Sequence, residues 1–268
     1  MENCEEILLQ TKALVIEVGA YIRQESKVFD RSQTETKGLH DYVSYVDKTS
    51  EQKLVAGLEK IFPEAGFIAE ENTSSRQGER YNWIIDPLDG TTNFIHGLPC
   101  FAISVALVED QSPILGIIYE INLDECFYAA KGLGAWLNGK PIRVSEMSAM
   151  EESFLATGFP YKNYGRLNPY MDLMKYLLNH TRGIRRLGSA ATDMAYVACG
   201  RFDAFYEYGL APWDVAAGII LIQEAGGEVS DFKGGKDYLF GKEINASNGK
   251  IHRDLGEVIA RFMNQSQD

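Results

Sequence analysis

Residues 83–91, Trp-Ile-Ile-Asp-Pro-Leu-Asp-Gly-Thr, join an apolar run to two closely spaced carboxylates and a glycine. The apolar run is typical of a buried strand, and Gly90 and Thr91 favour a tight turn after it. Two neighbouring carboxylates repel each other, and a hard cation such as Mg²⁺, which prefers oxygen ligands, relieves that repulsion. The stretch therefore predicts a Mg²⁺ site where the strand 83–85 meets a loop, and an exposed turn carboxylate at Asp86 is the simpler alternative.

The same stretch invites comparison with the phosphoaspartate motif D-x-D-G-T, whose first Asp is a nucleophile. Here the spacing is D-x-x-D-G-T, from Asp86 to Thr91. Side chains alternate between the two faces of a strand, so this spacing places Asp89 on the face opposite Asp86. We therefore expect no covalent aspartyl-phosphate mechanism.

Bulk composition indicates an ordinary globular protein, because 268 residues with 45% hydrophobic and 24% charged side chains can bury a large core. No apolar run approaches the roughly 20 residues that span a bilayer, and the acidic N-terminus lacks a basic signal-peptide region. The net charge of −12 argues against nucleic acid as the main partner. We expect a cytoplasmic protein with free thiols and no membrane partner, since no C-x-x-C pair occurs among Cys4, Cys100, Cys126 and Cys199.

The pattern of apolar residues predicts helices and strands that alternate along the chain, without a dinucleotide fingerprint or a P-loop. This indicates a layered, mixed α and β architecture with a seam near residues 140–150. An exposed loop or hairpin is expected at 30–44. The expected helices are 4–23, a second that is capped within 47–50 and closed by Pro63, then 168–179, 189–199, 213–225 and 250–262. The expected strands are 66–69, 83–85, 101–109, 114–121, 183–187, 203–207, 229 and 244–246.

Two further acids follow the same logic. Glu70 comes directly after the strand 66–69, so that Glu70 and Asp86 converge if their strands pair. Asp214 stands at the start of a helix, where the helix dipole favours a carboxylate. Taken alone, Glu70 reads equally well as a surface strand end and Asp214 as an ordinary N-cap; only together with Asp86 and Asp89 do they indicate a metal site.

Three blocks of sequence carry a resemblance that runs over nearly the whole chain. They are Ala-Glu-Glu at 69–71, Asp-Pro-Leu-Asp-Gly-Thr-Thr-Asn-Phe at 86–94 and Pro-Trp-Asp-Val-Ala-Ala-Gly at 212–218. In this order and separation they resemble the inositol monophosphatase family of Mg²⁺-dependent, lithium-sensitive phosphomonoesterases. The segment 37–47, with its Lys and Asp residues, is similar to the family's N-terminal segment. Gly188-Ser189-Ala190-Ala191 and Glu207 are similar to its substrate-side elements.

The resemblance implies an α+β fold, a layered αβαβα sandwich. It implies one catalytic domain over residues 1–268, with structural halves of about 1–145 and 146–268. It further implies a homodimeric phosphomonoesterase that uses two or three Mg²⁺ ions and acts on a small phosphorylated polyol or sugar.

Site roles carry over position by position. The implied metal ligands are Glu70, Asp86, the Leu88 carbonyl, Asp89 and Asp214, with Asp86 bridging two cations. The implied catalytic residues are Asp47, Thr91 and Glu70, of which Asp47 and Thr91 orient the attacking water. The implied substrate-binding residues are Asp89, Gly90, Thr91, Gly188, Ser189, Ala190, Glu207 and Asp214.

Some of these positions also have simpler readings. The small residues 188–191 would equally serve helix packing. Asp193 would face either the substrate or a dimer contact. We interpret Arg185 and Arg186 as charges on an exposed strand rather than as phosphate ligands.

The leading functional hypothesis is hydrolysis of inositol monophosphate by water. Within the same fold, fructose 1,6-bisphosphate, histidinol phosphate, a nucleotide 3′-phosphate or NADP are alternative substrates. A different class of protein, a non-catalytic metal-binding interaction module, would leave the repelling acids unused. A structural Ca²⁺ protein would saturate its cation and leave no room for water and phosphate.

Overall fold

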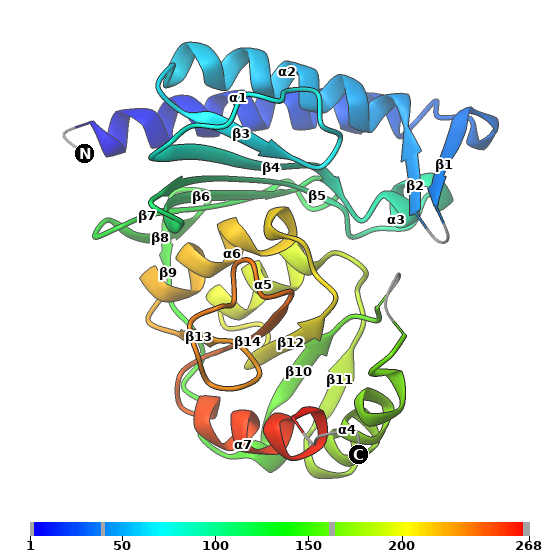
Figure 1. Cartoon of the computed structure of the whole chain (residues 1–268), viewed down its shortest axis with the longest axis vertical. Coiled ribbons are helices and arrows are strands. Elements are labelled where there is room, and N and C mark those ends of the chain that lie inside the picture. Colours follow the sequence, from blue (N-terminus) through cyan, green and yellow to red (C-terminus); the bar gives the residue numbers. More distant parts are fainter. Residues whose placement is uncertain (1–2, 39–40, 161–163, 265–268) are drawn as a thin grey trace.

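The structure is a computed structural model that describes residues 3–38, 41–160 and 164–264, without the side chains of residues 33, 36–38, 41 and 42. Helices and sheets are stacked in alternating layers (Figure 1). Helices α1 (Cys4–Glu25) and α2 (Tyr45–Ile61) cover one face of the larger sheet. Helices α5 (Ala190–Ala198) and α6 (Pro212–Glu224) lie between the sheets, and α4 (Leu167–His180) and α7 (His252–Met263) cover the far side. This confirms the αβαβα sandwich.

The larger sheet has the strand order β3-β4-β5-β6-β7-β8-β9. The pair β3 and β4 is parallel, and every later pair is antiparallel. The hairpin between β5 and β6 turns at Asp110 and Gln111, which both have positive φ. The strands are β3 (Gly66–Ala69), β4 (Tyr81–Asp89), β5 (Ala102–Glu109), β6 (Ser112–Glu120), β7 (Glu125–Ala130), β8 (Gly134–Leu137) and β9 (Lys140–Ile142).

The smaller sheet has the order β11-β10-β12-β14-β13. Strand β10 is parallel to both its neighbours, and β14 is antiparallel to both of its own. Its strands are β10 (Phe154–Thr157), β11 (Gly183–Arg185), β12 (Ala204–Tyr208), β13 (Glu228–Ser230) and β14 (Glu243–Ser247).

Both sheets are buried on two faces, so their strands read as continuous apolar runs. In β5, alternate side chains enter different cores: Ile103, Val105 and Leu107 pack toward α1 and α2, whereas Ala106 and Val108 pack toward α5 and α6. A third cluster lies between the smaller sheet and the pair α4 and α7. These three cores hold the layers together.

The N-terminal segment differs from expectation in one detail. The hairpin expected at 30–44 is present as β1 (Thr34–Gly38) and β2 (Asp41–Ser44), with a short 3₁₀ turn, η1 (Arg31–Gln33), before it. The cap of α2, however, is Ser44 rather than a residue within 47–50. Asp47 is the third residue of the helix, and it accepts the Ser44 N–H at 2.8 Å in a capping box.

A second 3₁₀ turn, η2 (Met150–Glu152), precedes β10, and α3 (Thr91–His96) follows β4.

No helix in the described ranges has the length and apolar character that a membrane crossing requires. All four cysteines are free thiols, and the pKa of Cys126 is raised to about 12 by burial.

Close contact between β6 and α6 depends on Gly116. A Cβ at this position would meet Ile220 Cγ2 at 2.5 Å and the Ala217 backbone at 2.8 Å. We expect Gly116→Ala to lower the free energy of unfolding by about 1–3 kcal/mol, because the layers would have to separate. Gly256→Ala in α7 is the control, since its nearest neighbour is 3.5 Å away and alanine favours a helix. Urea denaturation measures both, and equal effects at the two positions would contradict this view of the packing.

Candidate active site

The two aspartates of the central motif lie inside and at the end of β4, around a β-bulge. Asp86 is opposite Ser104 of β5, and Asp89 is opposite Ala102, so three steps along β4 match two along β5. The extra residue turns Leu88 into the core beneath α1 and α2 and leaves both carboxylates on the side of α5 and α6. The expectation that Asp86 and Asp89 lie on opposite faces is therefore wrong, and Asp86 is in a strand rather than at its junction with a loop.

An acidic cluster forms where β4 meets the start of α6. Asp86, Asp89 and Asp214 each offer a carboxylate oxygen within 4.8 Å of the others. Asp86 is only 2% exposed, and burial together with repulsion from Glu70, Asp89 and Asp214 raises its pKa well above the usual range. This electrostatic cost indicates that a cation belongs at the cluster.

Glu70 reaches Asp86 because β3 pairs with β4, the condition under which the sequence predicts that the two acids converge. The Glu70 N–H donates to the Ile85 carbonyl at 3.2 Å, which places the two acids side by side at neighbouring strands. Glu70 and Asp86 line one common cleft, although Glu70 is not among the three acids whose oxygens lie within 4.8 Å of one another. It is therefore placed to extend the cluster rather than to form its centre.

Asp214 occupies the first turn of α6 and is not the N-cap. Its Oδ2 accepts the N–H of Ala211, the actual N-cap residue, at 2.7 Å. Pro212 starts the helix with a φ that suits the first turn. The helix start thus fixes the Asp214 carboxylate toward β4.

Asp89 is anchored by the start of the other central helix, α5. Its Oδ2 accepts the Ser189 hydroxyl at 2.6 Å and the Ala191 N–H at 2.7 Å. These bonds lower the pKa of Asp89, but burial outweighs them and raises it to about 6. Ser189 was expected among the substrate-binding residues. In the structure its hydroxyl group donates to Asp89 and holds that carboxylate in position.

Thr91 and Asp47 are joined as expected. The Thr91 hydroxyl lies 2.9 Å from Asp47 Oδ1 and 2.9 Å from the Leu88 carbonyl. Asp47 is fully buried, and its other oxygen accepts the Ser44 hydroxyl at 2.6 Å. Sequence reasoning missed Ser44, although a serine three residues before Asp47 is the pattern of a capping box. The segment 37–47 is only partly testable, because residues 39–40 and the side chains of Lys37 and Asp41 lie outside the described part.

Two glycines let the loops of the cleft meet. Gly90 has φ +92°, and a Cβ there would lie 2.8 Å from the Cys100 carbonyl. Gly188 has φ +94°, and a Cβ there would lie 2.9 Å from Asn93 Nδ2. That amide donates to the carbonyls of Cys100 and Leu187 at 2.8 and 2.9 Å, so Asn93 ties the segment before α5 to the central motif.

A cleft of about 650 Å³ contains the expected metal and substrate residues together. Glu207, on β12, is 6% exposed, and its carboxylate lies against Gly158, where a Cβ would be 2.0 Å from Oε2. Arg186 is exposed as expected, but it lines this cleft, and its charge opposes the rise in the pKa of Glu207. The interpretation of Arg186 as a charge on an outer strand is therefore wrong, because it lies beyond the end of β11.

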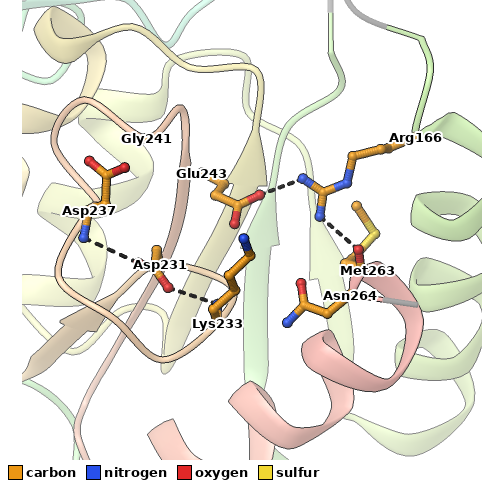
Figure 2. Close-up of a pocket in the computed structure, with 8 residues that line it drawn as sticks. All are labelled: Arg166, Asp231, Lys233, Asp237, Gly241, Glu243, Met263 and Asn264. Atoms are coloured by element: carbon orange, nitrogen blue, oxygen red, sulfur yellow. Dashed lines mark hydrogen bonds and ion pairs between the residues drawn. The ribbon is translucent and has the colours of Figure 1, made fainter. Parts of the chain in front are cut away.

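A second hollow, of about 430 Å³, adjoins the cleft and shares Arg166, Gly241 and Glu243 with it (Figure 2). Arg166 bonds Glu243 at 2.5 Å and the Met263 carbonyl at 3.0 Å. Asp231 accepts backbone N–H groups of the loop that it belongs to. Arg166 and Asp231 are thus engaged in contacts within the protein, Arg166 with Glu243 and Met263 and Asp231 with its own loop. The cleft that holds the acidic cluster is therefore the candidate active site.

Comparison with known proteins matches residues 3–267 to the inositol monophosphatase family. The "Nus factor SuhB" of Pseudomonas aeruginosa is 43% identical over 246 residues, which cover 90% of this chain and 91% of that protein. The "Fructose-1,6-bisphosphatase/inositol-1-monophosphatase" of Aquifex aeolicus is 36% identical over 264 residues, 98% of each chain. The solved inositol monophosphatase of Anabaena (Nostoc) superimposes with a TM-score of 0.86 at 37% identity, covering 97% of both chains.

Proposed function

Because the chain belongs to the inositol monophosphatase family and is thus a phosphoric monoester hydrolase, we propose that it hydrolyses a small polyol monophosphate with Mg²⁺ at the acidic cluster. Inositol monophosphate is the substrate that we favour. The observation that carries the proposal is the convergence of Asp86, Asp89 and Asp214 within 4.8 Å at one end of the cleft.

The donor set fits Mg²⁺. All the groups that converge are carboxylate oxygens, the ligands this cation prefers, and their mutual repulsion needs a positive charge. Asp86, Asp89 and Asp214 would hold it, with Glu70 and the Leu88 carbonyl beside them, and we propose two or three ions. When bound, Mg²⁺ neutralises charge on the phosphate oxygens and lowers the pKa of water in the site.

In this proposal, Thr91 orients the water that attacks phosphorus, and its hydrogen bonds support that role. A hydroxyl carries one hydrogen, so Thr91 donates to Asp47 or to the Leu88 carbonyl and keeps a lone pair to accept from water. Asp47 is itself held by Ser44 and cannot turn away. At the opposite end, Glu207 accepts from hydroxyls of the leaving alcohol, and the backbone at 188–190 allows that alcohol to come close.

We expect Thr91→Val to lower kcat about 100-fold with little change in KM, because the variant keeps the shape but cannot direct water. Thr91→Ser is the matched control and should keep the rate within about threefold of wild type, since it retains the hydroxyl. Steady-state phosphate release measures both, and thermal unfolding checks that Thr91→Val stays folded. Equal losses in the two variants would contradict the role of the hydroxyl.

The substrate itself is decided by a panel with Mg²⁺ present. Inositol 1-phosphate, fructose 1,6-bisphosphate, histidinol phosphate, a nucleotide 3′-phosphate and NADP should be compared by kcat/KM. We expect inositol 1-phosphate to lead, and a much faster turnover of another ester would reject inositol specificity while leaving the phosphatase intact.

We also propose a cytoplasmic homodimer without a nucleic-acid partner, supported by the net charge of −12 and by the family resemblance. A relative carries the name Nus factor, which fits the alternative of a non-catalytic interaction protein only weakly. The intact cluster of repelling acids, with Asp86 buried and Asp89 and Asp214 partly buried, weighs against that alternative, because an unused cluster would only destabilise the fold.

A further inference from the structure

One buried carboxylate in the cleft has no task in the function described so far. Asp193 lies in α5, one turn after Ser189, and is 1% exposed. Its Oδ1 has no hydrogen-bond partner within the described ranges. Yet the residue lines the same 650 Å³ cleft as the metal cluster. A buried carboxylate oxygen without a partner is costly, so a ligand group is the natural source of the missing hydrogen bond.

The surroundings of Asp193 narrow the identity of that ligand group. The cluster of carboxylate oxygens within 4.8 Å is made of Asp86, Asp89 and Asp214, and Asp193 is not a member. Its electrostatic neighbours are Glu207 and Asp89, which are acidic, and Arg186, which is basic. Asp193 therefore lies near both Glu207 and Asp89 but outside the group of metal-cluster carboxylates, where it can reach the alcohol part of a phosphate ester held at the metal.

Two neighbouring carboxyl groups suit a pair of neighbouring hydroxyls. Each hydroxyl donates one hydrogen bond and also accepts one, so it can bind a carboxylate or a carboxylic acid. A second phosphate group would instead bring negative charge against Asp193 and Glu207. The cleft thus favours a neutral, hydroxylated leaving group over a second anionic group at this point.

We propose that Asp193 is a specificity-determining residue that, together with Glu207, accepts hydrogen bonds from vicinal hydroxyls of the leaving polyol. This inference rests on the proposed phosphomonoesterase function. The inference adds a requirement to that function. The hydroxyls next to the ester carbon are recognised by Asp193 of α5 as well as by Glu207 of β12.

The test crosses variants with substrates that differ in these hydroxyls. Asp193→Ala should lower kcat/KM for inositol 1-phosphate about 10- to 100-fold, mainly through KM, and for cyclohexyl phosphate by less than about threefold. Asp193→Asn keeps an acceptor oxygen and should fall between wild type and Asp193→Ala. Asp172→Asn, an exposed acid on α4, is the matched control and should match wild type on both esters.

A second readout separates recognition from folding. Because Oδ1 lacks a partner in the free protein, Asp193→Asn should leave the Tm unchanged or raise it. A clear fall in Tm, or equal losses of kcat/KM on the two esters, would overturn the proposal and make Asp193 structural. A strong preference for histidinol phosphate that Asp193→Ala abolishes would also overturn it, since the partner would then be an ammonium group. If the wild-type protein releases phosphate from neither ester, that result would instead reject the proposed function.

Discussion

Replacing Asp86 by asparagine is expected to lower kcat at least about 1,000-fold, because it removes the central charge of the metal cluster. Asp86 is 2% exposed and interacts with all three of the other acids, Glu70, Asp89 and Asp214, so its loss removes the carboxylate common to the whole cluster. The variant should still fold, since the amide oxygen of asparagine can accept the Leu88 N–H that Asp86 Oδ1 accepts at 2.9 Å. Phosphate release with Mg²⁺ measures the loss.

Asp124→Asn provides the matched control. Asp124 is an exposed residue between β6 and β7, and asparagine tolerates its φ of 59°. This variant should retain wild-type kcat. If Asp86→Asn instead keeps kcat within about tenfold of wild type, the cluster is not where the chemistry occurs.

The second large effect concerns stability without metal. Burial raises the folded-state pKa of Asp89 to about 6, and repulsion adds to burial in raising that of Asp86 further above its ordinary value of 3.8. In the metal-free protein, the folded state therefore holds protons that the unfolded state has released. The contribution of these two groups to stability is therefore full below about pH 4 and is lost as the pH rises through about 6 and beyond. Glu207 and Asp193 are shifted in the same direction, whereas Arg186 opposes both shifts.

Mg²⁺ should reverse this loss. At pH 7.5, a concentration about 100 times Kd is expected to raise the Tm by about 5–10 °C. The rise should nearly vanish at pH 4.5, where Asp86 and Asp89 are protonated. Differential scanning calorimetry with Mg²⁺ or with chelator measures this. Asp86→Asn should be more stable than wild type in chelator and should respond less to Mg²⁺. An equal Mg²⁺ response at both pH values, or in both proteins, would contradict the assignment of the cluster.

Sequence patterns were most informative where local periodicity and burial agree. The strand at 66–69 and the helices that begin after Gly188 and end before Gly226 were predicted to within a residue or so, because apolar periodicity and glycine signals mark them. The position of each acid after an apolar run predicted that Glu70 and Asp86 converge if their strands pair, and the parallel pairing of β3 with β4 meets that condition.

The face of Asp89 was predicted wrongly because a bulge is a property of two strands at once. The regular alternation of β4 breaks between Asp86 and Asp89, and only the register against β5 reveals it. A signal was present in Pro87, since proline lacks the N–H for a ladder bond and within sheets is confined to edges, strand starts and bulges. With both carboxylates on one face, strand geometry does not argue against a phosphoaspartate; family membership carries the proposal of direct water attack.

Contacts between distant segments were beyond local patterns. Arg186 and Asp193 enter the cleft because β11 and α5 belong to the second sheet layer and its helices, whose position depends on packing across three cores. Their sequence neighbours resemble those of any charged strand end or small-residue helix.

The most direct test is the release of inorganic phosphate from inositol 1-phosphate by the purified wild-type protein, in Mg²⁺, in Ca²⁺ and in chelator. We expect turnover in Mg²⁺, none in chelator, and little in Ca²⁺, which prefers more ligands and a looser geometry. Equal phosphate release in Mg²⁺ and in chelator would contradict a metal-dependent site at Asp86, Asp89 and Asp214. Absence of release from this ester and from every other phosphomonoester in Mg²⁺ would contradict the enzyme itself.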